Sequence, residues 1–127
     1  AHVADGKPVW AECGGMMVLF ELLHQADGQT HPQWGLLPGQ VRMQSRLAAL
    51  GPQQLALRAG TLRGHTFHYS RCDTPLVPVA HTESVRGGVT KPGEAVYQRG
   101  SVRASYFHAW FASAPEAAAA LFLEAAL

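Results

Sequence analysis

The pattern of apolar and polar positions near the start of the chain predicts a strand, a tight turn and a helix. Residues 8–12 form a short extended segment, and the pair Gly14-Gly15 follows as a turn. From 16 to 24 the apolar residues have the spacing of a helix that packs on a sheet. This order of elements is typical of a mixed α/β domain.

The centre of the chain predicts strands. Gly and Pro residues punctuate residues 27–39, which we expect to form a loop. Beyond this loop the apolar residues alternate or occur in short bursts between turn signals. Two or three strands fit this pattern, and we place them within 42–50, 54–59 and 62–69.

The last third of the chain predicts further extended segments and a final helix. The extended part comprises a strand at 77–85, a mobile turn at 86–93, and a closing hairpin made by 95–98 and 102–107. Pro115 then stands near the start of an alanine-rich run that ends at Leu127. Because Pro suits a first helical turn and Ala and Leu favour helix, we expect a helix there.

Composition limits the class of protein. The 127 residues are enough for one domain, and the net charge of +1 comes from scattered basic residues that form no nucleic-acid footprint. No apolar run reaches the roughly 18 residues of a membrane span, and the first residues do not resemble a signal peptide. The only two cysteines, Cys13 and Cys72, lie in unlike settings, which argues against a disulfide framework. We therefore expect a cytoplasmic protein without nucleic-acid or membrane partners.

Cys13 is the candidate nucleophile. It stands between the predicted strand and a helix that starts with two glycines, as in a nucleophile elbow. A helix N-terminus favours a thiolate, and the N–H of Gly14 could stabilise an oxyanion. The alternative from spacing alone is a buried structural cysteine, which is the commoner fate of a lone cysteine.

Several motifs together resemble one family. The string from Gly6 to Met17, G-K-P-V-W-A-E-C-G-G-M-M, resembles the elbow of the glutamine amidotransferase domain in cobyrinic and cobyric acid synthases. Later stretches recur in that family in the same order: 35–39 (G-L-L-P-G), Met43, 46–47 (R-L), 62–70 (L-R-G-H-T-F-H-Y-S) and 104–108 (A-S-Y-F-H). The 63–70 string is the most specific of these and points to the a,c-diamide synthase branch.

The resemblance implies a fold, a reaction and a set of site residues. The fold is a three-layer α/β class I amidotransferase with a flavodoxin-like open sheet, and residues 1–127 would form this domain. Cys13 attacks the side-chain amide of glutamine to give a glutamyl thioester and ammonia, His108 is its base, and the Gly14 N–H belongs to the oxyanion hole. The residues implied to bind the substrate are Met17, His65, His68 and Tyr69.

The chain departs from the family pattern at two acidic positions. Many relatives with a full catalytic triad carry Glu two places after the histidine, where this chain has Trp110. The third member is therefore missing or supplied from elsewhere. Relatives also often have Glu where this chain has Thr66, so an acidic contact at that position is in doubt. His65 and His68 should point to opposite faces of a strand, so we expect no metal site.

The partners follow from the resemblance as well. An N-terminal synthetase domain would use ATP and Mg²⁺ to activate carboxylates of a corrin ring, and ammonia from this domain would amidate them. No phosphate-binding G-x-x-x-x-G-K-[ST] motif occurs in the chain, so we expect no ATP site here. Only one strand precedes the elbow, so we expect a fragment that lacks the first strands and the second oxyanion donor. The sequence is also compatible with a homodimer.

Two other classes of function compete with this interpretation. One is a non-catalytic module that keeps the fold for assembly, which the missing acid after His108 favours. The other is a cysteine hydrolase that acts on a different amide, which would share Cys13 and His108 but would not need the 63–70 string. A cobyric acid synthase-type amidotransferase is a third, closer alternative.

Overall fold

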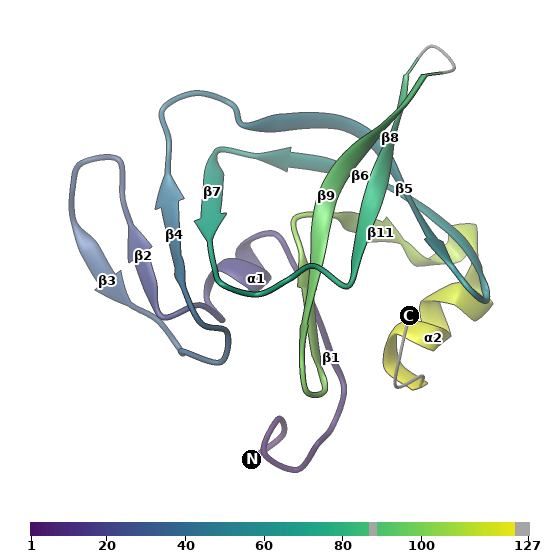
Figure 1. The fold of residues 1–127 in the computed structure, drawn as a ribbon, viewed down its shortest axis with the longest axis horizontal. Coiled ribbons are helices and arrows are strands. Elements are labelled where there is room, and N and C mark those ends of the chain that lie inside the picture. Colours follow the sequence, from purple (N-terminus) through teal and green to yellow (C-terminus); the bar gives the residue numbers. More distant parts are fainter. Residues whose placement is uncertain (87–88, 124–127) are drawn as a thin grey trace.

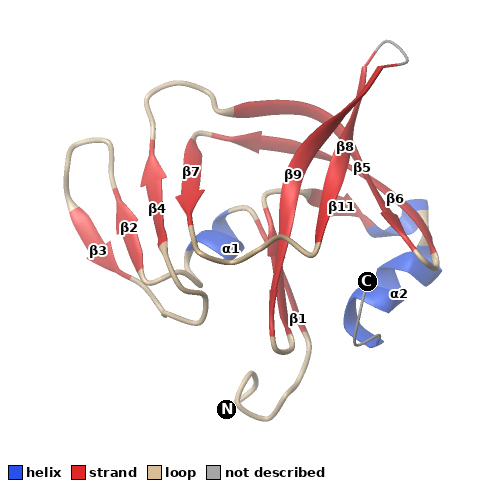
Figure 2. Cartoon of the chain, viewed as in Figure 1, coloured by secondary structure: helices blue, strands red, loops and turns tan. Residues whose placement is uncertain are grey.

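The computed structural model describes residues 1–86 and 89–123. This part of the chain is rich in strands and has two short α-helices (Figures 1 and 2). The strands are β1 (Val9–Glu12), β2 (Leu22–His24), β3 (Thr30–Pro32), β4 (Gln40–Met43), β5 (Ala49–Leu57), β6 (Gly60–His68), β7 (Ser70–Asp73), β8 (Ala80–Arg86), β9 (Val89–Arg99), β10 (Val102–Ser105) and β11 (His108–Trp110). The helices are α1 (Gly14–Met17), the 3₁₀ turn η1 (Phe111–Ser113) and α2 (Pro115–Leu123).

The strands form two sheets. A seven-stranded sheet has the order β1-β10-β9-β8-β5-β6-β11, and a four-stranded sheet has the order β3-β2-β4-β7. Strand β1 pairs with β10 in parallel and β2 with β4 in parallel, while the other neighbours are antiparallel. The predicted mixed α/β class is confirmed, with strands in the majority.

The helix predicted over 16–24 is wrong. Helix α1 ends at Met17, and Leu22–His24 forms strand β2 between β3 and β4. The apolar spacing that suggested a helix arises because Met16, Leu19 and Phe20 enter the core from a helical turn and a following bend. Short helices are marginal on their own, so pairing of β2 on both edges outweighs helix propensity. The loop predicted at 27–39 also contains the short strand β3.

Most of the other predicted elements are confirmed. The segment 8–12 contains β1, the predictions at 54–59 and 62–69 overlap β5 and β6, and β9 with β10 forms the closing hairpin. The strand predicted over 42–50 is wrong, because β4 ends at Met43 and β5 begins at Ala49. The turn predicted over 86–93 is too long, because β9 starts at Val89, and residues 87–88 lie outside the described part. Helix α2 begins at Pro115 as expected, while residues 124–127 of the predicted helix lie outside the described part.

Two hydrophobic clusters hold the elements together. One joins α1 to the small sheet and includes Met16, Phe20 and Val41, all with no exposed surface. The other joins α2 to the large sheet through residues such as Leu62, Phe107 and Leu121. In Figure 1 the small sheet and α2 lie at opposite ends of the molecule, with α1 and β1 between them.

The two edges of the seven-stranded sheet approach one another. Strands β1 and β11 stand at opposite ends of its strand order, yet the Ala109 N–H of β11 donates to the Glu12 carboxylate at the end of β1, at 3.0 Å. Trp10 of β1 and Phe107, just before β11, pack in the same cluster. The sheet therefore curls, and Glu12, the residue before Cys13, meets His108 at this seam.

Gly64 is required for the close approach of β11 to β6. It pairs with Ala109, and a Cβ added there would overlap the His108 carbonyl oxygen and the Phe107 ring. We expect Gly64→Ala to lower the free energy of unfolding by about 1–3 kcal/mol, the usual cost of overpacking. Gly15→Ala is the matched control, because a Cβ on Gly15 meets no atom within 4 Å. Equal stability of the two variants in chemical denaturation would contradict this packing.

Candidate active site

Cys13 lies at a strained turn between β1 and α1. Its backbone has φ 47° and ψ −113°, and it is the one non-glycine residue with positive φ in the described chain. The turn is fixed on both sides, because the Cys13 N–H donates to Ser105 O at 2.9 Å and its carbonyl accepts from Met17 N–H at 3.0 Å. Strain of this kind at a strand-to-helix turn is the geometry of a nucleophile elbow.

The Cys13 thiol lies half-buried beside β6. Its Sγ donates to the Phe67 carbonyl oxygen at 3.8 Å, a long contact with a weak donor. Burial raises the pKa of the thiol, the Gly14 N–H opposes this rise, and the Glu94 and Glu12 carboxylates add to it. The start of helix α1 favours the thiolate through the Gly14 N–H, as the sequence predicts, but burial and the two carboxylates outweigh this effect, and the pKa is raised. A thiol with this pKa requires a base.

His108 is the first residue of β11, which pairs with β6. It pairs with His65 in register, and the two rings stack with centroids 4.8 Å apart and planes 8° apart. His65 and Phe67 stand two places apart on β6, so the positions on β6 that His108 and Cys13 contact are about 7 Å apart along the strand. The expected hydrogen bond between them is not formed among the described residues, since the thiol donates to Phe67 instead. Such bonds commonly tighten only in the substrate complex.

A carboxylate lies beside His108 from the opposite edge of the sheet. Glu12 Oε1 accepts from the Trp10 indole N–H at 2.7 Å and from the Ala109 N–H at 3.0 Å. Glu12 Oε2 is 3.9 Å from His108 Nδ1. Glu12 is not among the site residues predicted from the sequence, where only its place directly before Cys13 connects it to the site.

The residues implied to bind the substrate fall into two groups. His68 and Met17 face the interior, because His68 stacks on Tyr106 at 3.6 Å and Met17 Sδ accepts from Ser70 Oγ at 3.5 Å. His65 and Tyr69 are exposed. The predicted opposite orientation of His65 and His68 is thereby confirmed.

Glu94 supplies a carboxylate beside Thr66. Its Oε1 accepts from Thr66 Oγ1 at 2.6 Å and lies 2.8 Å from His68 Nε2. Burial would raise the pKa of Glu94, but the hydrogen bonds from His68 and Thr66 outweigh it and hold the pKa below its usual value. The acid that Thr66 itself cannot provide therefore comes from β9. No sequence signal linked residue 94 to residue 66, because the sheet alone brings them together.

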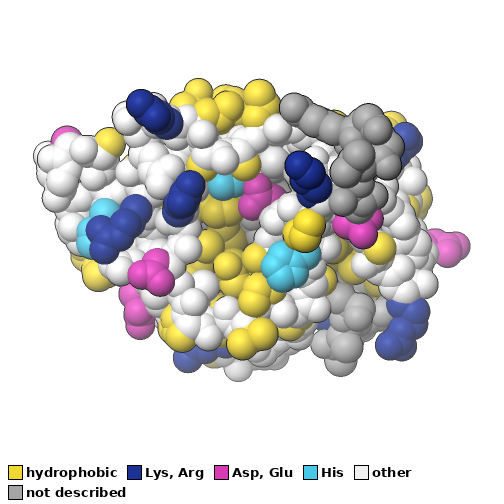
Figure 3. Space-filling model, turned by 45° about the horizontal axis from the view of Figure 1, so that its top comes forward, with side chains coloured by type: hydrophobic (Ala, Val, Ile, Leu, Met, Phe, Trp, Pro, Cys, Tyr) yellow, Lys and Arg dark blue, Asp and Glu magenta, His cyan; other side chains and the backbone are white. Residues whose placement is uncertain are grey.

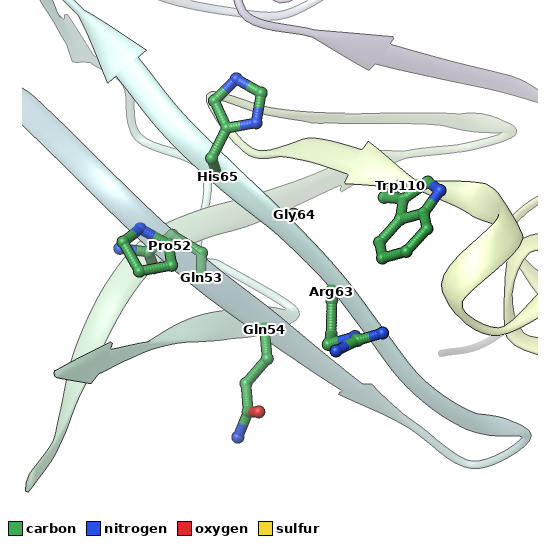
Figure 4. A pocket seen from close by; sticks show the side chains of 7 residues that line it. All are labelled: Pro52, Gln53, Gln54, Arg63, Gly64, His65 and Trp110. Carbon is green, nitrogen blue, oxygen red and sulfur yellow. The ribbon is translucent and has the colours of Figure 1, made fainter. Parts of the chain in front are cut away.

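Two hollows flank these groups. One, of about 220 Å³, is lined by His68, Ser70, Arg71, Cys72, Glu94, Ala95, Tyr97 and Tyr106. The other, of about 440 Å³, lies over β5, β6 and β11, with His65 at one side and Trp110 at the other (Figure 4). Arg63 covers the Trp110 ring, 5.1 Å from its centroid. Figure 3 shows a face on which hydrophobic side chains form the floor of a hollow and charged and histidine side chains surround it.

The described residues contain no group of three or more His, Cys, Asp or Glu side chains arranged to hold a metal ion. No helix among them has the length and hydropathy to cross a membrane.

A mixed α/β domain with a cysteine at an elbow and a histidine on the strand at the opposite edge of the curled sheet is consistent with enzymes that form a thioester on cysteine. The chain belongs to the CobB/CobQ-like glutamine amidotransferase domain family, which it matches over residues 1–116. This finding confirms the resemblance seen in the sequence motifs.

The similar proteins are named as a,c-diamide synthases. The chain is 51% identical to a cobyrinate a,c-diamide synthase of Herminiimonas arsenicoxydans over 96% of this chain and 27% of the relative. It is 48% identical to a hydrogenobyrinate a,c-diamide synthase of Pseudomonas aeruginosa over 98% of this chain and 28% of the relative. A cobyrinate a,c-diamide synthase of Dehalococcoides mccartyi is 36% identical over 90% of this chain and 27% of its own length. The chain thus spans little more than a quarter of the length of these relatives.

Proposed function

We propose that this chain is the ammonia-generating domain of a glutamine-dependent a,c-diamide synthase that acts on cobyrinate or hydrogenobyrinate. The observation that carries the proposal is the strained elbow at Cys13, with the Gly14 N–H beside the thiol and with both Cys13 and His108 in contact with β6. The names of the relatives support the substrate, and both corrin names occur among them.

The chain's own groups account for each step of glutamine hydrolysis. His108 accepts the thiol proton, and Cys13 Sγ attacks the side-chain amide carbon of glutamine. The Gly14 N–H stabilises the oxyanion of the tetrahedral intermediate. Its collapse breaks the C–N bond, the leaving nitrogen takes the proton from His108, and ammonia departs. Water then hydrolyses the glutamyl thioester to glutamate and restores the thiol.

The pocket beside Glu94 supports recognition of an amino acid. Glutamine carries an α-ammonium and an α-carboxylate, and the hollow of about 220 Å³ is lined by both Glu94 and Arg71. Side chains of opposite charge in the lining of one pocket suit a zwitterion. The Glu94 carboxylate also lies near enough to raise the Cys13 thiol pKa. We assign Glu94 to the α-ammonium and Arg71 to the α-carboxylate.

The remaining steps belong to the rest of the protein. The relatives are nearly four times as long as the matched segment, which is consistent with a separate synthetase domain. We propose that this domain uses ATP and Mg²⁺ to activate the corrin carboxylates, and that the complete enzyme is cytoplasmic.

The test is transfer of labelled nitrogen. The complete enzyme is incubated with glutamine labelled with ¹⁵N in the side-chain amide, ATP, Mg²⁺ and either cobyrinate or hydrogenobyrinate. We expect a product with two ¹⁵N amides by mass spectrometry and stoichiometric glutamate. Release of glutamate without a labelled corrin product would favour the cysteine hydrolase. Formation of neither glutamate nor labelled product would favour the non-catalytic module.

A further inference from the structure

Position 110, where a triad acid would follow His108, is occupied by an aromatic residue. Trp110 packs under the guanidinium of Arg63 and cannot carry a proton or a negative charge. A catalytic histidine nevertheless benefits from a carboxylate at the nitrogen that does not face the nucleophile, because it fixes the tautomer and stabilises the imidazolium.

We infer that Glu12, on the strand that delivers Cys13, is the residue that positions His108. Its Oε2 lies 3.9 Å from His108 Nδ1, and both side chains are about 30% exposed, with values of 32% for His108 and 28% for Glu12. The nucleophile and the positioning acid are therefore adjacent in sequence, and the base comes from the opposite edge of the sheet. The inference rests on the proposed function of Cys13 and His108.

The Glu12 carboxylate is held in this place by two donors. The Trp10 indole and the Ala109 N–H both donate to Oε1, which turns Oε2 toward the imidazole. Because Ala109 follows His108 directly, Glu12 restrains the backbone of β11 as well as the ring. The His65 ring stacks parallel to the His108 ring and thereby restricts the plane of the His108 ring.

This arrangement assigns a role to each imidazole nitrogen. A carboxylate beside Nδ1 favours the tautomer with its proton on Nδ1, and Nε2 is then the acceptor for the thiol proton. Once His108 is protonated, the negative charge of Glu12 stabilises the resulting ion pair with the thiolate.

The variant Glu12→Gln separates positioning from a purely structural role. The amide oxygen of glutamine can still accept both hydrogen bonds from Trp10 and Ala109, whereas its NH₂ group cannot accept from Nδ1–H. We expect kcat for glutamine hydrolysis by the complete enzyme to fall roughly 10- to 100-fold, with KM, thermal stability and ammonia-dependent amidation unchanged. Glu12→Ala should lose the same activity and also stability, because it removes both acceptors.

Glu21→Gln is the matched control. Glu21 Oε2 also accepts a backbone N–H, that of Gly39 at 2.9 Å, and no histidine is recorded beside it in the described chain. It should keep the wild-type kcat. A Glu12→Gln enzyme with wild-type kcat, or one whose loss of kcat is matched by lost stability, would overturn the inference.

A measurement independent of turnover completes the test. Nitrogen shifts of ¹⁵N-labelled histidine, assigned by loss of the signal in a His108 variant, should show the proton on Nδ1 in the wild type and on Nε2 in Glu12→Gln. The same tautomer in both proteins would contradict the role of Glu12. If the wild type itself fails to hydrolyse glutamine, the proposed function fails, and the tautomer still decides the inference.

Discussion

Replacing Cys13 with serine should abolish glutamine-dependent amidation in the complete enzyme while leaving amidation with added ammonia intact. Only the release of ammonia from glutamine passes through the thioester, whereas attack of ammonia on an activated carboxylate does not. Loss of a catalytic nucleophile costs on the order of 10⁴- to 10⁶-fold in kcat. The two activities are measured on the same preparation by product mass spectrometry.

Cys72→Ser is the control for this experiment. Cys72 is the other free cysteine, and its Sγ contacts the Tyr97 hydroxyl at 3.6 Å. Because Cys72 lines the hollow assigned to glutamine but does not stand at the elbow, the variant should retain the ammonia-dependent reaction and lose far less of the glutamine-dependent rate than Cys13→Ser. Loss of the ammonia-dependent reaction in Cys13→Ser would instead place Cys13 in the synthetase chemistry.

His108→Ala should lower the glutamine-dependent rate about 10²- to 10⁴-fold, the usual contribution of a general base, and should change its pH dependence. Without His108 the thiol must ionise unaided. Because burial and the nearby carboxylates raise the Cys13 pKa above its usual value, the thiolate fraction at neutral pH is small and rises about tenfold per pH unit below that pKa. The residual rate should therefore climb steadily into the alkaline range.

His81→Ala provides the comparison, since His81 is an exposed histidine of β8. Its pH profile should match that of the wild type. A His108→Ala enzyme with the wild-type rate and profile would remove His108 from the mechanism.

The site residues that could be predicted are those with local signals. The elbow at Cys13 is encoded by a short strand and two glycines, and the extended segment ahead of His108 is equally local. The family resemblance then assigned Cys13 and His108 to one site, although they lie 95 positions apart in the sequence. Both now lie beside β6, at positions His65 and Phe67.

The parts that could not be predicted depend on how the sheets close. Residues 16–24 have helical spacing, but the pairing of β2 with β3 and β4 determines their structure. Glu12 and Glu94 look like ordinary surface acids in the sequence. Glu12 enters the site because the large sheet curls. Glu94 enters it because β9 pairs with β8, and β8 pairs with β5 of the β5–β6 hairpin. The raised pKa of Cys13 is likewise a result of burial and of these two carboxylates.

The central claim is that Cys13 is the nucleophile that attacks glutamine, and chemical labelling tests it most directly. The complete protein is treated with a chloroketone analogue of glutamine, with and without glutamine, and the modified peptide is identified by mass spectrometry. Burial raises the pKa of both thiols, so neither is activated by a lowered pKa. The account predicts an adduct on Cys13, formed before any on Cys72 and slowed by glutamine. Labelling of Cys72 first, or labelling of Cys13 that glutamine does not slow, would contradict it.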